Sequence, residues 1–144
     1  MSRLPPSTRA EFKRFYPVTT RWMDNDVYGH VNNVVYYAWF DTAVNRFLIG
    51  SGVLDIARSP QIGLMVESGC RYHSSVSYPD EVTIGLRVGK LGTSSVRYEL
   101  AAFRGEETTA AADAFLVHVF VDRGTQRPAP IAPEARAALA QLAA

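Results

Sequence analysis

Cysteine is almost absent from this sequence. Its 144 residues include one, Cys70, so the chain can form no intramolecular disulfide and lacks the common multi-cysteine zinc motifs. A structural metal site and an oxidising compartment are therefore not expected. We expect a protein without a metal that works in the reducing cytoplasm.

Charge of one sign does not dominate either. The sequence has 15 Lys and Arg residues against 14 Asp and Glu residues, which gives a formal net charge of +1. Such a balance creates no broad electrostatic field for nucleic acid or an anionic membrane. We expect neither as a partner, and an anionic ligand must be held by a local site.

Long hydrophobic runs are missing as well. No stretch approaches the ~20 apolar residues that a membrane helix requires, and the N-terminal segment MSRLPPSTRAEFKRF has no apolar core of signal-peptide length. Internal repeats and domain linkers are not evident. With 47% hydrophobic and 20% charged residues, the composition predicts one globular domain over residues 1–144, in which residues 1–12 form an irregular lead-in.

What the sequence does contain is a dense group of polar residues before a hydrophobic helix. Two aspartates, a glycine, a histidine and two asparagines lie between Asp24 and Asn33. Backbone N–H groups at a helix start have no partner within the helix, and the helix dipole is positive there, so such a site can stabilise developing negative charge. A carboxylate beside it suggests acyl-transfer or hydrolytic chemistry.

The hydrophobic helix is predicted over residues 33–49. Asn32 or Asn33 can cap its start, and Gly50 and Gly52 favour its end. Apolar and aromatic residues occupy most of its circumference. We therefore expect the rest of the fold to wrap around this helix.

The remaining sequence predicts antiparallel strands joined by short turns. From Val82 to Gly89 apolar residues alternate with small or polar ones, which is the pattern of a sheet with one buried face. Strands are predicted over residues 15–22, 63–78, 82–89, 95–103 and 108–122, and a helix over residues 133–144. This order predicts an α+β fold, with one curled antiparallel sheet of about five strands wrapped round a long central helix and a short C-terminal helix.

The polar segment carries the motif Asp-x-Asp-x-x-Gly-His-Val-Asn-Asn followed by a tyrosine. Its residues are Asp24, Asp26, Gly29, His30, Val31, Asn32, Asn33 and Tyr36 or Tyr37. With this motif the chain resembles the hotdog-fold thioesterase superfamily, in the branch of 4-hydroxybenzoyl-CoA thioesterase and the acyl-CoA thioesterases. Residues 90–95 also resemble the family's third-to-fourth strand turn, and residues 121–131 its last strand and proline-rich exit.

The resemblance implies a role for three residues of the motif. Asp26 corresponds to the family's catalytic carboxylate, which either attacks the thioester carbonyl or activates a water molecule. The backbone N–H of Asn33 corresponds to the hydrogen-bond donor to the thioester oxygen. His30 could protonate the leaving thiolate, although a structural role through ring hydrogen bonds in the loop is favoured.

Contacts to the substrate and to coenzyme A are expected from the same loop and from two turns. The candidates are Tyr28, Gly29, Asn32, Lys90, Thr93, Ser94, Ser95, Arg123 and Arg127. Turns commonly expose such residues to solvent, so we expect only some of the turn residues to make true contacts.

Other residues of chemical interest have structural explanations. Asp24 is expected to order the turn by accepting backbone hydrogen bonds. His73 and His118 are expected to pack within strands or to face a partner, and Cys70 to fill space as a small apolar side chain rather than act as a nucleophile. Glu67 lies where some relatives place further catalytic residues, and no motif fixes its role.

The resemblance therefore implies an acyl-CoA thioesterase that hydrolyses an acyl or aroyl thioester to free acid and thiol without a cofactor. The thioester could be carried by coenzyme A or by a carrier protein. Relatives form dimers in which two sheets join edge to edge and each active site lies at the subunit interface. We therefore expect a homodimer or homotetramer, and the open edge of a single sheet favours the same outcome.

Two alternatives stay open. A hotdog hydratase or dehydratase would act on the same thioesters, but those branches carry an Asp followed by Asn-Pro and a histidine, or a histidine followed by Phe-Pro. Here Val31 and Asn32 follow His30. The second alternative is a non-catalytic module that binds acyl-CoA, and the retained Asp26 argues against it.

Overall fold

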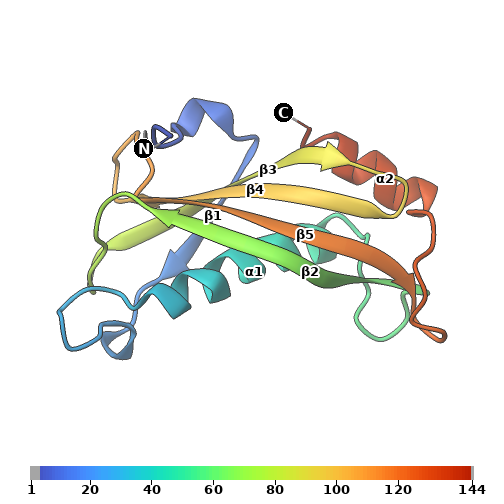
Figure 1. Ribbon diagram of the computed structural model, residues 1–144, viewed down its shortest axis with the longest axis horizontal. Helices are drawn as coiled ribbons and strands as arrows, with labels where there is room; N and C mark the ends of the chain where they lie inside the picture. The colour runs from blue at the N-terminus through green and yellow to red at the C-terminus, as the bar shows by residue number, and fades with distance from the viewer. Residues whose placement is uncertain (1–3, 144) are drawn as a thin grey trace.

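The computed structural model describes residues 4–143. Five strands form one antiparallel sheet in the order β1-β3-β4-β5-β2. In chain order the elements are η1 (Arg9–Glu11), β1 (Arg14–Thr19), η2 (Trp22–Asp24), α1 (Asn33–Gly50), β2 (Gln61–Tyr72), β3 (Glu81–Leu91), β4 (Ser95–Arg104), β5 (Ala112–Asp122) and α2 (Pro133–Ala140). The sheet curls over α1, as predicted, and α2 packs near the end of β3 (Figure 1).

The core lies between α1 and the sheet face that is turned toward it. Phe40 and Val44 of α1 are fully buried, as are Ile84 of β3, Leu100 of β4 and Leu116 of β5. Burial of an apolar side chain of this size stabilises the folded state by roughly 1.5–3 kcal/mol. The strict alternation seen in the sequence of β3 and β4 thus marks the face that holds the helix.

The sheet covers α1 on one side only. Ala38, Asp41 and Thr42 on the other side are exposed, and Val34 keeps 68% of its surface accessible. The curled sheet therefore packs on the helix as predicted, and the side of α1 turned away from the sheet stays exposed in the single chain. No helix within residues 4–143 is long and apolar enough to cross a membrane.

Several predicted element boundaries are wrong. The first predicted strand ends at Thr19 because η2 follows it, the last begins at Ala112, and the C-terminal helix ends at Ala140. The strand predicted over residues 63–78 ends at Tyr72. The backbone N–H groups of residues 73 and 74 both donate to the carbonyl of residue 111, a long-range turn contact that no local pattern indicates.

β2 is an edge strand, and its position matters for the site. It pairs with β5 on one side, and on its other side no strand from the described residues is present. A bulge between Met65 and Glu67 bends it. Leu64, Met65 and Val66 are 38%, 44% and 60% exposed, so the free edge is also apolar.

Candidate functional site

Asp24 orders the turn that precedes α1. Its side chain is 1% exposed, and its carboxylate accepts the backbone N–H of Arg21 at 2.8 Å and the Arg21 guanidinium Nε at 3.0 Å. Its carbonyl accepts the N–H of Asn32 at 2.9 Å. Both ends of the turn are therefore tied to one buried residue, which confirms the structural role predicted for Asp24.

Asp26 lies at the tip of the same turn and is only partly buried. Its Oδ1 accepts the backbone N–H of Tyr28 at 2.9 Å. Its own N–H donates to the carbonyl of His30, and its carbonyl accepts the N–H of Gly29. Such an Asx turn fixes one carboxylate oxygen. Oδ2 makes no hydrogen bond to residues 4–143, so it is the oxygen that can act on a ligand.

The first turn of α1 offers an unpaired backbone donor. The Asn32 side chain caps the helix by accepting the N–H of Val34 at 3.0 Å, and its carbonyl accepts the N–H of Val35. The N–H of Asn33, the first helical residue, finds no acceptor in the described part of the chain. The Asn32 cap thus fixes the orientation of the Asn33 peptide and leaves the Asn33 N–H available to an oxygen of a ligand.

Contacts from the β2–β3 connection hold the turn in place. The N–H of Val31 donates to the carbonyl of Val76 at 2.7 Å, and the Ser77 hydroxyl donates to the carbonyl of Gly29 at 2.9 Å. These residues are distant in sequence, so the turn is fixed from both sides. Gly29 itself has a φ of 82°, which favours glycine at this position.

Tyr72, at the end of β2, also contacts the helix start. Its hydroxyl donates to the carbonyl of Asn33 at 3.3 Å, and its ring packs edge-on against Tyr36, 5.2 Å away. Burial raises the pKa of Tyr72, so its hydroxyl stays protonated and able to donate. Sequence reasoning missed this residue, because only the observed pairing of β2 brings it to a residue 39 positions earlier.

A cavity of about 250 Å³ opens beside the helix start. It is lined by His30, Val31, Asn33, Tyr36, Tyr72, His73, Ser74 and Ser75. Two of the predicted catalytic residues, His30 and Asn33, therefore share one hollow. Asp26 does not line the cavity, but it lies in the same turn as His30 and Val31, which do.

The comparisons with known proteins identify the family of this chain. A family model of the thioesterase-like superfamily matches residues 18–139. The chain belongs to this superfamily. No functionally curated protein matches this thioesterase-like protein significantly.

Solved structures similar to this thioesterase-like protein extend over nearly its whole length. The PA5185 protein from Pseudomonas aeruginosa strain PAO1 is 51% identical, with 97% of this chain and 98% of that chain covered and a TM-score of 0.94. Slr0204, a 1,4-dihydroxy-2-naphthoyl-CoA thioesterase from Synechocystis, is 16% identical, with coverages of 89% and 96% and a TM-score of 0.79. The BH1999 gentisyl-coenzyme A thioesterase is 22% identical, with coverages of 88% and 99% and a TM-score of 0.77. The last two share the hotdog fold with this chain.

The residues outside the catalytic turn that were predicted to contact coenzyme A lie far from that turn in this thioesterase-like protein. Lys90 lies near the end of β3, Thr93 and Ser94 in the β3–β4 connection, and Ser95 at the start of β4. This end of the sheet is opposite the start of α1 (Figure 1). Arg127 is near the same end, because the segment after β5 bonds to that connection. One chain therefore does not bring these residues together with the catalytic candidates.

Three residues of the loop were also predicted to contact the substrate. Gly29 adopts the positive φ of the turn and Asn32 caps α1. The Tyr28 side chain is 83% exposed. The His30 ring is exposed and makes no hydrogen bond to residues 4–143. The expected ring hydrogen bonds of His30 are thus not found, because the carbonyl of His30, rather than its ring, completes the turn.

Cys70 is not equipped to act as a nucleophile in this thioesterase-like protein. Burial raises the pKa of its thiol to about 11, so the thiolate is scarce near neutral pH. Its neighbourhood supports the predicted role as a small packing residue, since it lies against the hydrophobic core.

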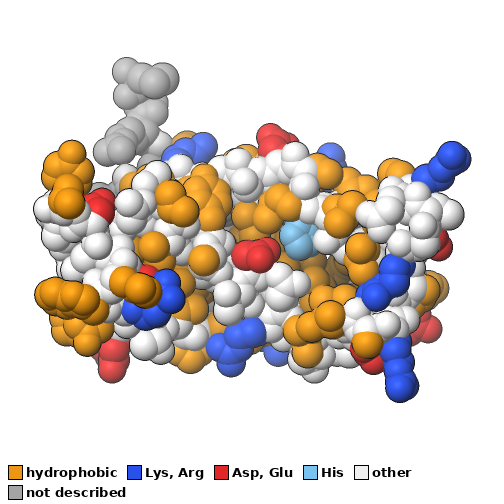
Figure 2. Space-filling model, turned by 90° about the horizontal axis from the view of Figure 1, so that it is seen from below, with side chains coloured by type: hydrophobic (Ala, Val, Ile, Leu, Met, Phe, Trp, Pro, Cys, Tyr) orange, Lys and Arg blue, Asp and Glu red, His pale blue; other side chains and the backbone are white. Residues whose placement is uncertain are grey.

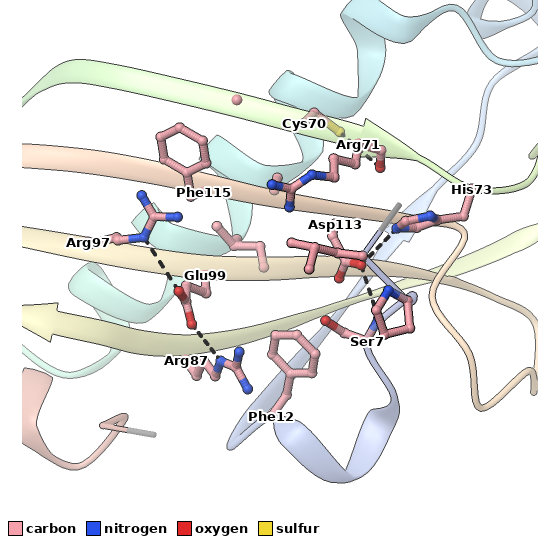
Figure 3. A pocket seen from close by; sticks show the side chains of 15 residues that line it. Ser7, Phe12, Cys70, Arg71, His73, Arg87, Arg97, Glu99, Asp113 and Phe115 are labelled. Atoms are coloured by element: carbon pink, nitrogen blue, oxygen red, sulfur yellow. Dashed lines mark hydrogen bonds and ion pairs between the residues drawn. The ribbon is translucent and has the colours of Figure 1, made fainter. Parts of the chain in front are cut away.

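A larger hollow of about 510 Å³ lies on the sheet face that is turned away from α1. Figure 3 shows that ion pairs span it. Glu99 bridges Arg87 at 2.9 Å and Arg97 at 3.4 Å, and His73 Nε2 lies 2.9 Å from Asp113 Oδ2. None of the predicted catalytic residues lines this hollow. The start of α1 is therefore the candidate functional site.

Proposed function

We propose that this protein is an acyl-CoA thioesterase, which uses water to cleave an acyl or aroyl thioester to the free acid and the thiol. The observation that carries the proposal is the Asn33 N–H, which is unpaired at the capped start of α1 in the same turn as the Asp26 carboxylate. Membership of the thioesterase-like superfamily supports it. So do neighbours with the same fold that are named as coenzyme A thioesterases.

The Asn33 N–H supplies the oxyanion donor in this proposal. As a nucleophile adds to the thioester carbon, negative charge develops on the carbonyl oxygen, and this N–H and the positive end of the helix stabilise it. One such preorganised donor contributes about 2.7–4 kcal/mol to transition-state stabilisation. The C–S bond then breaks and the sulfur leaves as a thiolate.

Asp26 supplies the base or the nucleophile. In one route its carboxylate takes a proton from the attacking water, and in the other it attacks the carbonyl carbon to form an acyl anhydride that water then opens. Both routes require the ionised carboxylate. The hydrogen bond from the Tyr28 N–H to Oδ1 orients the carboxylate and leaves Oδ2 for the water or the carbonyl carbon.

A homodimer completes the proposal. The free edge of β2 exposes Val66, and the turn before α1 exposes Val27 and Tyr28, which are 94% and 83% accessible. Pairing of two β2 edges about a two-fold axis would cover these surfaces. It would also bring the β3–β4 connection of one subunit toward the catalytic turn of the other, so that Lys90 and Arg127 could reach the same ligand.

The test is release of free thiol from a panel of acyl-CoA and aroyl-CoA substrates. We expect wild type to release thiol and Asp26→Asn to lower kcat by about 10²- to 10⁴-fold, the usual contribution of a positioned base. Glu106→Gln is the matched control, since Glu106 is an exposed acid in the β4–β5 turn with no hydrogen bond to the described residues. Wild type that cleaves no substrate, or Asp26→Asn with full activity, would refute the proposal.

A further inference from the structure

A separate cavity of about 180 Å³ lies at the other end of α1 from the catalytic turn. The C-terminal half of α1, the α1–β2 loop, the start of β2 and the end of β5 form its walls, which are mainly apolar. Leu48, Gly63, Phe120 and Arg123 are among its lining residues. Figure 2 shows the side of the molecule along which α1 and β2 run, where a histidine lies in a hollow between hydrophobic side chains and one acidic side chain.

Buried polar atoms without partners occur in one residue that lines this cavity, Arg123, and in His118, which packs against the lining residue Gly63. Within residues 4–143 they include His118 Nδ1, the Tyr98 hydroxyl oxygen and Arg123 Nε. His118 is 4% exposed and Tyr98 is 0% exposed, and their rings lie edge to face at 5.2 Å. Unsatisfied buried polar groups are rare in folded proteins because each is costly. His118 Nδ1 and Arg123 Nε therefore lack acceptors that an oxygen from outside the chain could supply.

His118 packs against Gly63, which lines the cavity. A Cβ at position 63 would lie 2.9 Å from His118 Nδ1, so glycine keeps the space in front of this nitrogen free of a side chain. Burial lowers the pKa of His118, and the ring is therefore neutral near pH 7. A neutral ring can present Nδ1 as a donor, and Arg123 Nε can only donate. An oxygen acceptor suits both.

Arg123 adds an uncompensated positive charge to the same wall. One of its terminal nitrogens donates to the carbonyl of Ile56 at 2.7 Å, and the guanidinium forms no ion pair with a described residue. A carboxylate or hydroxyl on a ligand would provide the missing acceptor at this point.

We propose that this cavity takes the far end of the acyl group and that His118 and Arg123 select acyl groups whose far end carries an oxygen acceptor. The proposal rests on the thioesterase activity proposed above and names its substrate class. Because a cavity of about 150 Å³ accommodates a benzene ring, this one takes an acyl end of roughly six carbon atoms. Leu48 and Phe120 contact the apolar part, and the two nitrogens contact the oxygen.

The second subunit brings this cavity to the reacting carbonyl. Within one chain, Asn33 and the cavity residue Asn45 are about 18 Å apart along α1, at ~1.5 Å per residue. In a two-fold pairing of β2 edges the strands run antiparallel, so the start of one β2 faces the end of the other. The cavity borders the start of β2, and Tyr72 at its end contacts Asn33. In such a pairing each cavity would adjoin the oxyanion donor of the partner subunit.

Three substrates of equal carbon number test the selection: hexanoyl-CoA, 6-hydroxyhexanoyl-CoA and adipoyl-CoA. We expect wild type to cleave at least one oxygen-ended substrate with a kcat/KM about 3- to 10-fold above that for hexanoyl-CoA, the effect of one net hydrogen bond. A preference for the hydroxyl points to His118 as the main contact, and a preference for the carboxylate points to Arg123.

Variants then assign the preference to these side chains. His118→Phe should bring the hydroxyhexanoyl-to-hexanoyl ratio to about one, and Arg123→Met should do the same for the adipoyl-to-hexanoyl ratio, whereas Glu106→Gln should keep both ratios. Gly63→Ala provides a second variant that fills the space before Nδ1, and it should also reduce both ratios. Melting temperatures verify that each variant is folded.

The outcomes separate this proposal from the one on which it rests. No thiol release from any substrate would refute the thioesterase assignment and this proposal together. Cleavage of the three substrates at equal rates, as expected if buried water satisfies the three polar atoms, would refute the selection alone. The selection would also be refuted if the hydroxyhexanoyl-to-hexanoyl and adipoyl-to-hexanoyl ratios of wild type persisted in both His118→Phe and Arg123→Met.

Discussion

At the scale of single residues, burial separates two aspartates of the same motif. Asp24 is buried and uses its carboxylate on Arg21, so it holds the turn. Asp26 is partly exposed and uses one oxygen on the Tyr28 N–H, which leaves the other for a ligand. The spacing in the sequence shows both residues, but only their surroundings show which of them can act on a substrate.

Tyr72→Phe tests whether the Tyr72 hydroxyl positions the oxyanion donor. Loss of its bond to the Asn33 carbonyl should lower kcat by about 3- to 10-fold, because a neutral hydrogen bond contributes a net ~0.5–1.5 kcal/mol. KM should stay within about two-fold, because the aromatic ring still lines the cavity. Steady-state kinetics measures both. Tyr78→Phe is the control, and a Tyr72→Phe enzyme with unchanged kcat would contradict the positioning role.

Cys70 predicts a pH dependence of stability at the alkaline end. The pKa of its thiol is about 11 in the folded protein and near 9 in the unfolded chain. The unfolded chain therefore loses this proton first, and the contribution of Cys70 to stability is complete below about pH 9 and is lost as the pH rises toward 11. Urea unfolding at pH 8 and pH 10.5 should show that the free energy of unfolding falls less between these pH values for Cys70→Ala than for wild type. Equal losses would contradict the raised pKa.

At the scale of elements, α1 has two functions. Its buried side forms the core with the sheet, and its first turn provides the capped start that holds the Asn33 N–H. The β2–β3 connection fixes the turn in front of it through Val76 and Ser77. The site therefore depends on two elements that no local sequence pattern links.

Asn32→Ala tests the cap of α1. Loss of the side-chain acceptor for the Val34 N–H should lower the free energy of unfolding by about 1 kcal/mol, the usual contribution of an N-cap. It should also lower kcat, because the neighbouring Asn33 peptide becomes less well oriented. Asn32→Asp keeps an acceptor at the cap and should retain the stability. Urea unfolding and kinetics measure the two effects, and an Asn32→Ala protein as stable as wild type would count against the cap.

Much of the fold could be predicted from local patterns. The five strands follow from period-two alternation and turn residues, and α1 follows from its cap and its terminal glycines. The end of β2 could not be predicted, because it depends on bonds from residues 73 and 74 to residue 111. The motif alone indicated Asp26 and Asn33. The contact of Tyr72 with Asn33 and the contact between Gly63 and His118 could not be predicted, because they depend on the register of β2 and β5.

At the scale of the whole molecule, the single chain leaves two surfaces uncovered. Its sheet leaves one side of α1 exposed and one edge of β2 unpaired within the described residues. The turn residues expected to contact coenzyme A lie at the opposite end of the sheet from Asp26 (Figure 1). A second copy related by a two-fold axis would pair the free edge of β2 and bring the turn residues of one chain toward Asp26 of the other.

Val66→Lys tests that assembly. Val66 is 60% exposed at the bulge of β2, and a charged residue on a free edge disfavours strand pairing. Light scattering after gel filtration should show a multiple of the 15.9 kDa chain mass for wild type and a larger share of single chains for Val66→Lys. Activity should fall in proportion to the single chains. Thr108→Lys, which adds the same charge in an exposed loop, should change neither. A wild type of one chain mass would contradict the proposed dimer.

The two edges of the sheet differ in a way that limits how far assembly can proceed. β1, at the edge opposite β2, is short and contains Pro17, which has no N–H to donate to an added strand. Each molecule therefore has one edge that accepts a neighbour and one that resists it. When two copies join through β2, both receptive edges are used up. Growth by repeated strand addition would then stop, so the proposed dimer would also protect the protein from filament formation.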